Sequence, residues 1–63
     1  MYKVHAFLND KMVINRQMKH LPRNGDTLRL NENTYAKVTE VIWAMDEDVS
    51  GGQRVNLRLE ALE

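Results

Sequence analysis

The chain has 63 residues, enough for one domain, and its nine Lys/Arg and nine Asp/Glu give zero net charge. It contains no cysteine, which excludes disulfides and thiolate metal sites. No apolar run approaches the roughly 18 residues that span a bilayer, and no secretory h-region follows the first methionine. We therefore expect a single soluble domain, residues 1–63, in the cytoplasm and without membrane contact.

Charge is divided unevenly along the sequence. Residues 1–30 hold six Lys/Arg against two Asp/Glu, a net charge of +4, and residues 31–63 hold three against seven, a net charge of −4. Such asymmetry can mark a polar partner surface. The favoured interpretation is that the two halves interleave in space and their charges pair, with the small stabilisation that exposed pairs provide.

The first elements expected are two strands joined by a short hairpin. Over residues 2–8 apolar and polar side chains alternate with the period of a half-buried strand, and only Phe7 departs from the alternation. Residues 9–11 are turn formers. Residues 12–18 make the second strand, in which Arg16 interrupts an otherwise apolar face.

A sharp turn is predicted at residues 21–26, Leu-Pro-Arg-Asn-Gly-Asp. Pro22 fixes its own φ and has no N–H for a ladder. Gly25 can adopt the positive φ that a tight turn requires, and Asp26 can hydrogen-bond the neighbouring backbone. A third strand follows this turn and ends at a second polar turn, residues 31–33.

Residues 34–45 are ambiguous between helix and strand. Apolar residues at helical spacing compete with a high content of β-branched and aromatic residues. If the segment is a strand, Val38 faces inward before Glu40, and Val41 and Trp43 face inward after it. This shift of the inward positions by one residue is what a β-bulge would produce. Because small barrels need such a bend to close, we favour one long bent strand at about 34–45.

The remaining segments are an acidic loop with glycines at its end, residues 46–52, and a cleanly alternating strand, residues 54–62. Turn signals every 8–12 residues predict five short strands. The predicted fold class is therefore all-β, a small five-stranded antiparallel barrel.

Three motifs in this pattern resemble those of small, mostly uncharacterised phage and bacterial proteins. They are Leu-Pro-Arg-x-Gly-Asp-x-Leu at 21–28, Tyr-x-x-Val-x-x-Val-x-Trp at 35–43 and Gln-Arg-Val-Asn-Leu at 53–57. The resemblance covers nearly the whole chain after residue 20. It implies an SH3-like β-barrel, distantly similar to the KOW-type barrels of nucleic-acid-associated proteins. Its shared positions are turn and core residues, so it implies architecture and, by analogy, a regulatory or host-directed binding role.

Catalytic, metal and cofactor sites find no support in these residues. The two histidines fit no ligand-spaced motif, and residues 46–48 lack the spacing of a calcium loop. The glycine pair at 51–52 has no Lys-Ser/Thr continuation of a phosphate loop, and Ser50 has no histidine near it in sequence. A barrel of this size is filled by its own side chains. We expect no enzyme, no catalytic or metal-binding residue and no cofactor.

The favoured function is protein–protein binding by a small non-enzymatic module. SH3-like barrels present loops and a strand edge to partners, and Trp43 and Tyr2 would be binding hot spots if partly exposed. Arg23 stands at the tip of the predicted turn although the turn does not require an arginine. The partner-binding residues expected are Phe7, Arg16, Arg23, Arg29 and Trp43.

Two alternative functions stay open. A nucleic-acid-binding module would use the basic residues of the N-terminal half, gathered around Pro22. Zero net charge weighs against this alternative, as does the expectation that Tyr35 and Trp43 belong to the core. A homodimer or other self-assembly would cover open edge strands and supplement a small core.

Overall fold

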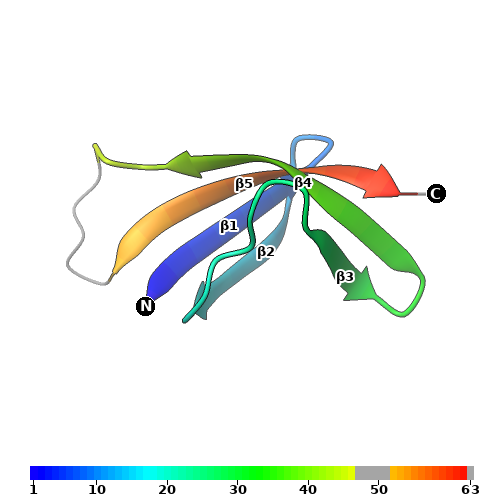
Figure 1. Ribbon diagram of the computed structural model, residues 1–63, viewed down its shortest axis with the longest axis horizontal. Helices are drawn as coiled ribbons and strands as arrows, with labels where there is room; N and C mark the ends of the chain where they lie inside the picture. The colour runs from blue at the N-terminus through cyan, green and yellow to red at the C-terminus, as the bar shows by residue number, and fades with distance from the viewer. Residues whose placement is uncertain (47–51, 63) are drawn as a thin grey trace.

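A computed structural model describes residues 1–46 and 52–62, and this described part consists of five β-strands and no helix. The strands are β1 (Tyr2–Leu8), β2 (Lys11–Met18), β3 (Thr27–Asn31), β4 (Thr34–Trp43) and β5 (Gln53–Leu62). They form one sheet in the order β2-β1-β5-β4-β3, which curls into a half-barrel (Figure 1). The prediction of a five-stranded all-β fold is confirmed. Within the described residues, nothing has the length and apolarity of a membrane-crossing helix.

The sheet is mixed, so the prediction of a purely antiparallel barrel is wrong. β1 pairs with β5 in parallel, with Val4 opposite Val55 and Ala6 opposite Leu57, whereas the other three pairings are antiparallel. The β1–β2 hairpin and the β3–β4–β5 meander each have an apolar inner face. Either relative direction of the two units would bury those faces, so the alternation in the sequence does not decide between them.

The core lies on the inner face of the sheet, the face toward which Val4 and Ala6 point. Its buried residues come from alternating positions of the three central strands: Val4, Ala6, Ala36, Val38, Val55, Leu57 and Leu59. Partly buried side chains from β2, β3 and the connection 19–26, among them Leu21, pack against this cluster. β2 and β3 are the two edges of the sheet, so the inner face is open between them.

Local backbone rules account for the turns. The two-residue hairpin turn at residues 9–10 has φ values of 52° and 65°, as a tight hairpin requires. In the predicted turn at 21–26, Gly25 has φ 98° and donates its N–H to the carbonyl of Val38 at 2.8 Å. The N–H of Arg23 donates to the carboxylate of Asp26 at 2.8 Å. The turn prediction is confirmed, and the turn is fastened to β4.

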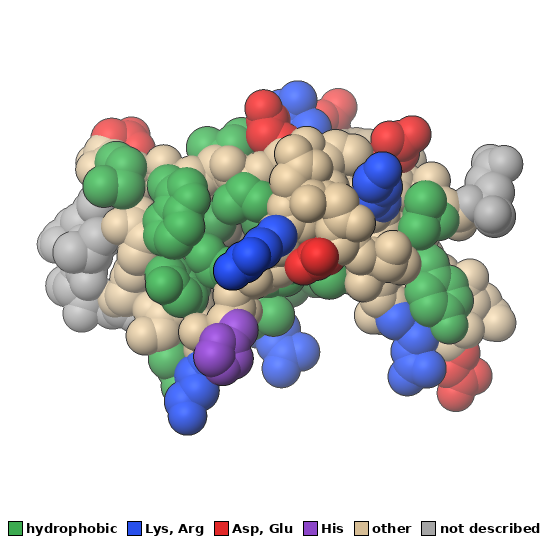
Figure 2. Space-filling model, in the orientation of Figure 1, with side chains coloured by type: hydrophobic (Ala, Val, Ile, Leu, Met, Phe, Trp, Pro, Cys, Tyr) green, Lys and Arg blue, Asp and Glu red, His purple; other side chains and the backbone are tan. Residues whose placement is uncertain are grey.

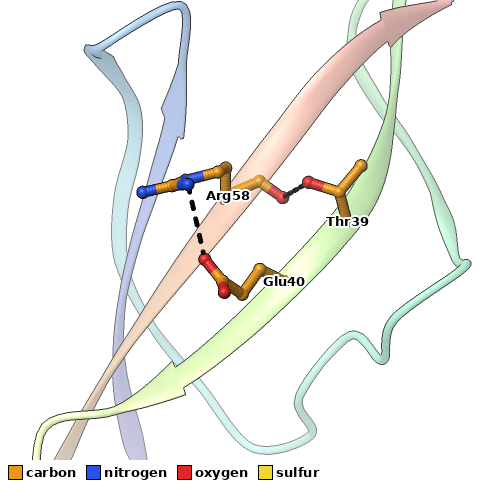
Figure 3. Close-up of polar contacts among 3 residues, drawn as sticks. All are labelled: Thr39, Glu40 and Arg58. Atoms are coloured by element: carbon orange, nitrogen blue, oxygen red, sulfur yellow. Dashed lines mark hydrogen bonds and ion pairs between the residues drawn. The ribbon is translucent and has the colours of Figure 1, made fainter.

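β4 bends at a bulge, as the phase switch in its sequence predicted. The register with β5 shifts between Val38 and Glu40, which leaves Thr39 as the extra residue. The Thr39 hydroxyl donates to the carbonyl of Arg58 at 3.1 Å, and the Arg58 guanidinium lies 3.6 Å from the Glu40 carboxylate (Figure 3). The long bent strand is confirmed, although it ends at Trp43, two residues earlier than expected.

Candidate partner-binding site

Two aromatic rings meet at one end of the inner face. Tyr2 begins β1 and Trp43 ends β4, and the two strands flank β5, where their register partners are Gln53 and Val55. The ring centroids lie 5.6 Å apart with the planes at 82°, a favourable edge-to-face arrangement. Because 46% of Trp43 is exposed, the pair presents its indole to solvent.

The expectation that Trp43 and Tyr35 are core residues is wrong. Trp43 does follow the inward phase of β4, since it lies opposite the buried Val55, but the half-barrel does not close over this end. Tyr35 is 44% exposed because the next residue, Ala36, takes the inward position and leaves Tyr35 on the outer face. The inward phase of Trp43 was read correctly, but the open barrel leaves this position uncovered, whereas Tyr35 was assigned to the wrong face.

The aromatic pair forms one wall of a hollow of about 530 Å³ that we call the Trp43 hollow. Its opposite wall is the connection between β2 and β3. The residues lining it are Tyr2, Lys19, His20, Leu21, Pro22, Arg23, Asn24, Val41 and Trp43. Figure 2 shows apolar side chains gathered at this end of the molecule, with Lys, Arg and His side chains beside them. The hollow thus has an apolar floor and a cationic rim.

Hydrogen bonds fix the backbone on both walls of the Trp43 hollow. Directly after Trp43, the N–H of Ala44 donates to the carbonyl of Arg54 at 3.1 Å, which keeps the end of β4 attached to β5. On the other wall, Arg23 and Asp26 exchange two bonds: the Arg23 N–H reaches the carboxylate, and the Asp26 N–H donates to the Arg23 carbonyl at 3.0 Å. Side chains on a backbone held this way need less ordering when a partner binds.

The structure brings the predicted arginines together only in part. Arg23 lines the Trp43 hollow with Trp43 itself. Arg16 and Arg29 line a separate hollow between the edge strands β2 and β3. Pro22 borders both hollows, so the basic residues expected around the turn divide between its two sides.

Phe7, the fifth predicted partner-binding residue, does not join either group. It lies in register with Arg58 on the outer face of β1, because its neighbours Ala6 and Leu8 take the inward positions. Sequence reasoning did not include His20 among the candidates. Its position directly before the Leu21-Pro22 turn was the available signal, since the whole turn forms one wall of the hollow.

Charge pairing between the two halves of the sequence is not seen in residues 1–46 and 52–62. The ion pair described there joins Arg58 to Glu40, which both belong to the acidic second half. Among the same residues, no three His, Asp or Glu side chains gather closely enough to hold a metal. Most of the predicted acidic loop at 46–52 lies outside the described residues.

No protein-family model, curated protein or solved structure matches the chain, so its function is inferred from the geometry of the described residues.

Proposed function

We propose that the protein is a small non-enzymatic binding module that holds an extended segment of a partner protein in the Trp43 hollow. The observation that carries this proposal is the half-exposed Trp43, braced by Tyr2 and faced by Arg23 across the hollow. Tryptophan, tyrosine and arginine are the residue types that dominate binding energy at protein interfaces. Their convergence on a fixed backbone is what an interface anchor requires.

We also propose that the half-barrel is SH3-like. Barrels of that kind bind extended peptides in aromatic-lined grooves, and the Trp43 hollow has aromatic residues and a connecting loop in the corresponding roles. The resemblance to phage and bacterial proteins supports a regulatory or inhibitory role, in which the bound segment belongs to a cellular protein.

The lining of the Trp43 hollow indicates the chemistry of the bound segment. Its floor, with Tyr2, Leu21 and Val41, suits an apolar side chain. Its rim carries Lys19 and Arg23, which complement carboxylates and add little attraction for a basic segment. We therefore expect an extended segment with an apolar residue flanked by Asp or Glu.

Trp43 is the only tryptophan of the chain, so its fluorescence reports the hollow directly. The test is a titration with two sets of short synthetic peptides that share a central apolar residue and differ in acidic or basic flanks. The acidic set should shift the Trp43 emission to the blue and saturate, because the bound segment covers the indole. Equal binding of both sets, or no saturable shift, would contradict the proposal.

Three variants connect the binding to the Trp43 hollow. Trp43→Ala should weaken binding of the acidic set by about tenfold or more, measured by calorimetry. Arg23→Glu should reverse the preference toward basic flanks. Arg29→Glu is the matched control, because it makes the same charge change at an exposed arginine of the other hollow. An effect of Arg29→Glu equal to that of Arg23→Glu would mean that net charge alone, with no defined site, drives binding.

A further inference from the structure

A second hollow, of about 650 Å³, lies on the outer face of β1, β2 and β5. Its lining residues are Lys3, His5, Asn15, Arg16, Gln17, Gly52 and Arg54. None of these described residues carries an acidic or an apolar side chain. We call this surface the Lys3 hollow, and it faces away from the Trp43 hollow because Lys3 and His5 alternate with the buried Val4 and Ala6.

The strand register sets the outer side chains in two rows across the sheet. The rows are Gln17–Lys3–Arg54 and Asn15–His5–Asn56. Neighbouring strands are about 4.8 Å apart, so each row covers about 10 Å of sheet. Cations and amides in this arrangement offer a strip of hydrogen-bond donors with positive charge.

Polar side chains on the outer face of a sheet are ordinarily explained by their contact with solvent. The β4–β5 half of the same face shows the charge pairing that is typical of such a surface. There Glu40 lies 3.6 Å from Arg58, and Lys37 stands opposite Glu60. Opposite charges in register are a common means of stabilising an exposed sheet surface. By contrast, the residues in register with Lys3 are a glutamine and an arginine, so Lys3 has no carboxylate opposite it on either neighbouring strand.

Two atoms beside the Lys3 hollow lack hydrogen-bond partners. The Nδ1 atom of His5 and the Oδ1 atom of Asn56 are shielded from solvent, yet neither makes a hydrogen bond within residues 1–46 and 52–62. The two residues are in register on β1 and β5, so the unsatisfied groups occur in one place. Shielded polar groups without partners cost free energy, and a ligand that supplies donors and acceptors removes that cost once the two side chains turn toward it.

An aromatic ring continues the same strip. Phe7 follows His5 by two residues on the outer face of β1, about 7 Å along the strand. It is half-buried, lies in register with Arg58, and lines a different hollow together with Asp10 and Asn56. Cations, amides and an aromatic ring on one sheet face are the combination with which proteins bind single-stranded nucleic acids.

We infer that the outer face of β1, β2 and β5 binds a single-stranded nucleic acid, with a backbone phosphate in the Lys3 hollow and a neighbouring base stacked on Phe7. Of the arginines that the sequence placed in a nucleic-acid site, only Arg16 borders this hollow. The inference does not depend on peptide binding in the Trp43 hollow, which opens on the other face.

The test is the fluorescence anisotropy of a labelled oligothymidylate titrated with the full chain. Binding should be measurable at about 50 mM salt and weaken roughly sevenfold at about 200 mM if two phosphates are contacted. Lys3→Glu should weaken binding by about fivefold or more, since it replaces a phosphate contact with repulsion. Phe7→Leu should also weaken it about fivefold, because leucine fills the space without offering a stacking face. The emission of Trp43 on the other face checks that each variant that retains Trp43 is folded.

Lys37→Glu is the matched control, since Lys37 is an exposed lysine of the same outer face on β4. Unchanged binding by Lys37→Glu and by Trp43→Ala would support the assignment and separate it from the peptide site. An absence of binding at low salt, or an equal loss with Lys37→Glu, would overturn it. Thymidine monophosphate and a phosphoserine peptide serve as competitors. If either competes as strongly per phosphate as the unlabelled oligonucleotide does, the hollow is an isolated phosphate site and the inference is overturned.

Discussion

The ring centroids of Tyr2 and Trp43 lie 5.6 Å apart in an edge-to-face arrangement, across the width of β5. The contact stabilises the fold and orients the indole. Tyr2→Leu should lower the free energy of unfolding by about 0.5–1.5 kcal/mol and shift the Trp43 emission to the red. Urea unfolding followed by that emission measures both effects. Tyr35→Leu is the control, because Tyr35 lies on the outer face, and a loss of the same size there would rule out a special role for the ring pair.

Two glycines with positive φ should respond differently to substitution. A Cβ on Gly25 would meet nothing within 4 Å, so Gly25→Ala pays only for the left-handed backbone, about 1–2 kcal/mol. A Cβ on Gly52 would collide with the carbonyl oxygen of Met1, so Gly52→Ala should cost more. Thermal unfolding of the two variants tests this order. Gly25→Val should lower stability but leave peptide affinity unchanged once the affinity is corrected for the fraction of folded protein. A stable Gly25→Val protein that has lost its peptide affinity would show that the turn itself binds.

The bulge in β4 should depend measurably on one side-chain hydrogen bond. Thr39→Val keeps the β-branched shape and removes the hydroxyl that donates to the Arg58 carbonyl. Since this bond is exposed to solvent, we expect a loss near the lower end of the usual range, about 0.5 kcal/mol. Thr39→Ser retains the donor and should restore the carbonyl contact. Chemical denaturation of both variants decides, and equal stability of Thr39→Val and wild type would remove the bond's assigned role.

The β2 edge should support self-association at high protein concentration. β2 is an edge strand of the sheet, and two of its apolar residues, Met12 and Val13, are 49% and 43% exposed. An exposed edge with apolar side chains is a template for a second copy, which would pair with it about a two-fold axis. Val13→Lys should lower the dimer fraction seen by sedimentation equilibrium. Ile42→Lys is the control, since Ile42 is 41% exposed but belongs to β4, which is paired with a strand on both sides. A monomer at every concentration would contradict this expectation.

Most of the secondary structure could be predicted because one face of each central strand is buried and the edge strands pack partly buried side chains against that core. The alternation in residues 2–8 and 54–62 and the phase switch near Glu40 all reflect that burial, and the structure confirms them. The parallel pairing of β1 with β5 could not be predicted, since it joins two units whose inner faces are compatible with either direction. Exposure of Trp43 depends on that pairing and on the open end of the half-barrel.

The candidate sites were less accessible to sequence reasoning than the strands. The Trp43 hollow was found in part, through Arg23 and Trp43, because a turn with an unneeded arginine is visible in the sequence. The Lys3 hollow was missed, because its rows join residues from three strands that only the parallel register aligns. The outward polar residues of β1 and β5 were the available signal, but each strand alone looks like an ordinary solvated face.

The central position of the β1–β5 pair also constrains how the chain folds. Val4 and Val55 lie side by side in the sheet but about 50 residues apart in sequence. A loop of most of the chain must therefore close before the core contacts between β1 and β5 can form. Folding should therefore be slow for a chain of this size. During synthesis, β1 to β4 would leave the ribosome without their central partner strand, and the sheet would form only once β5 has emerged.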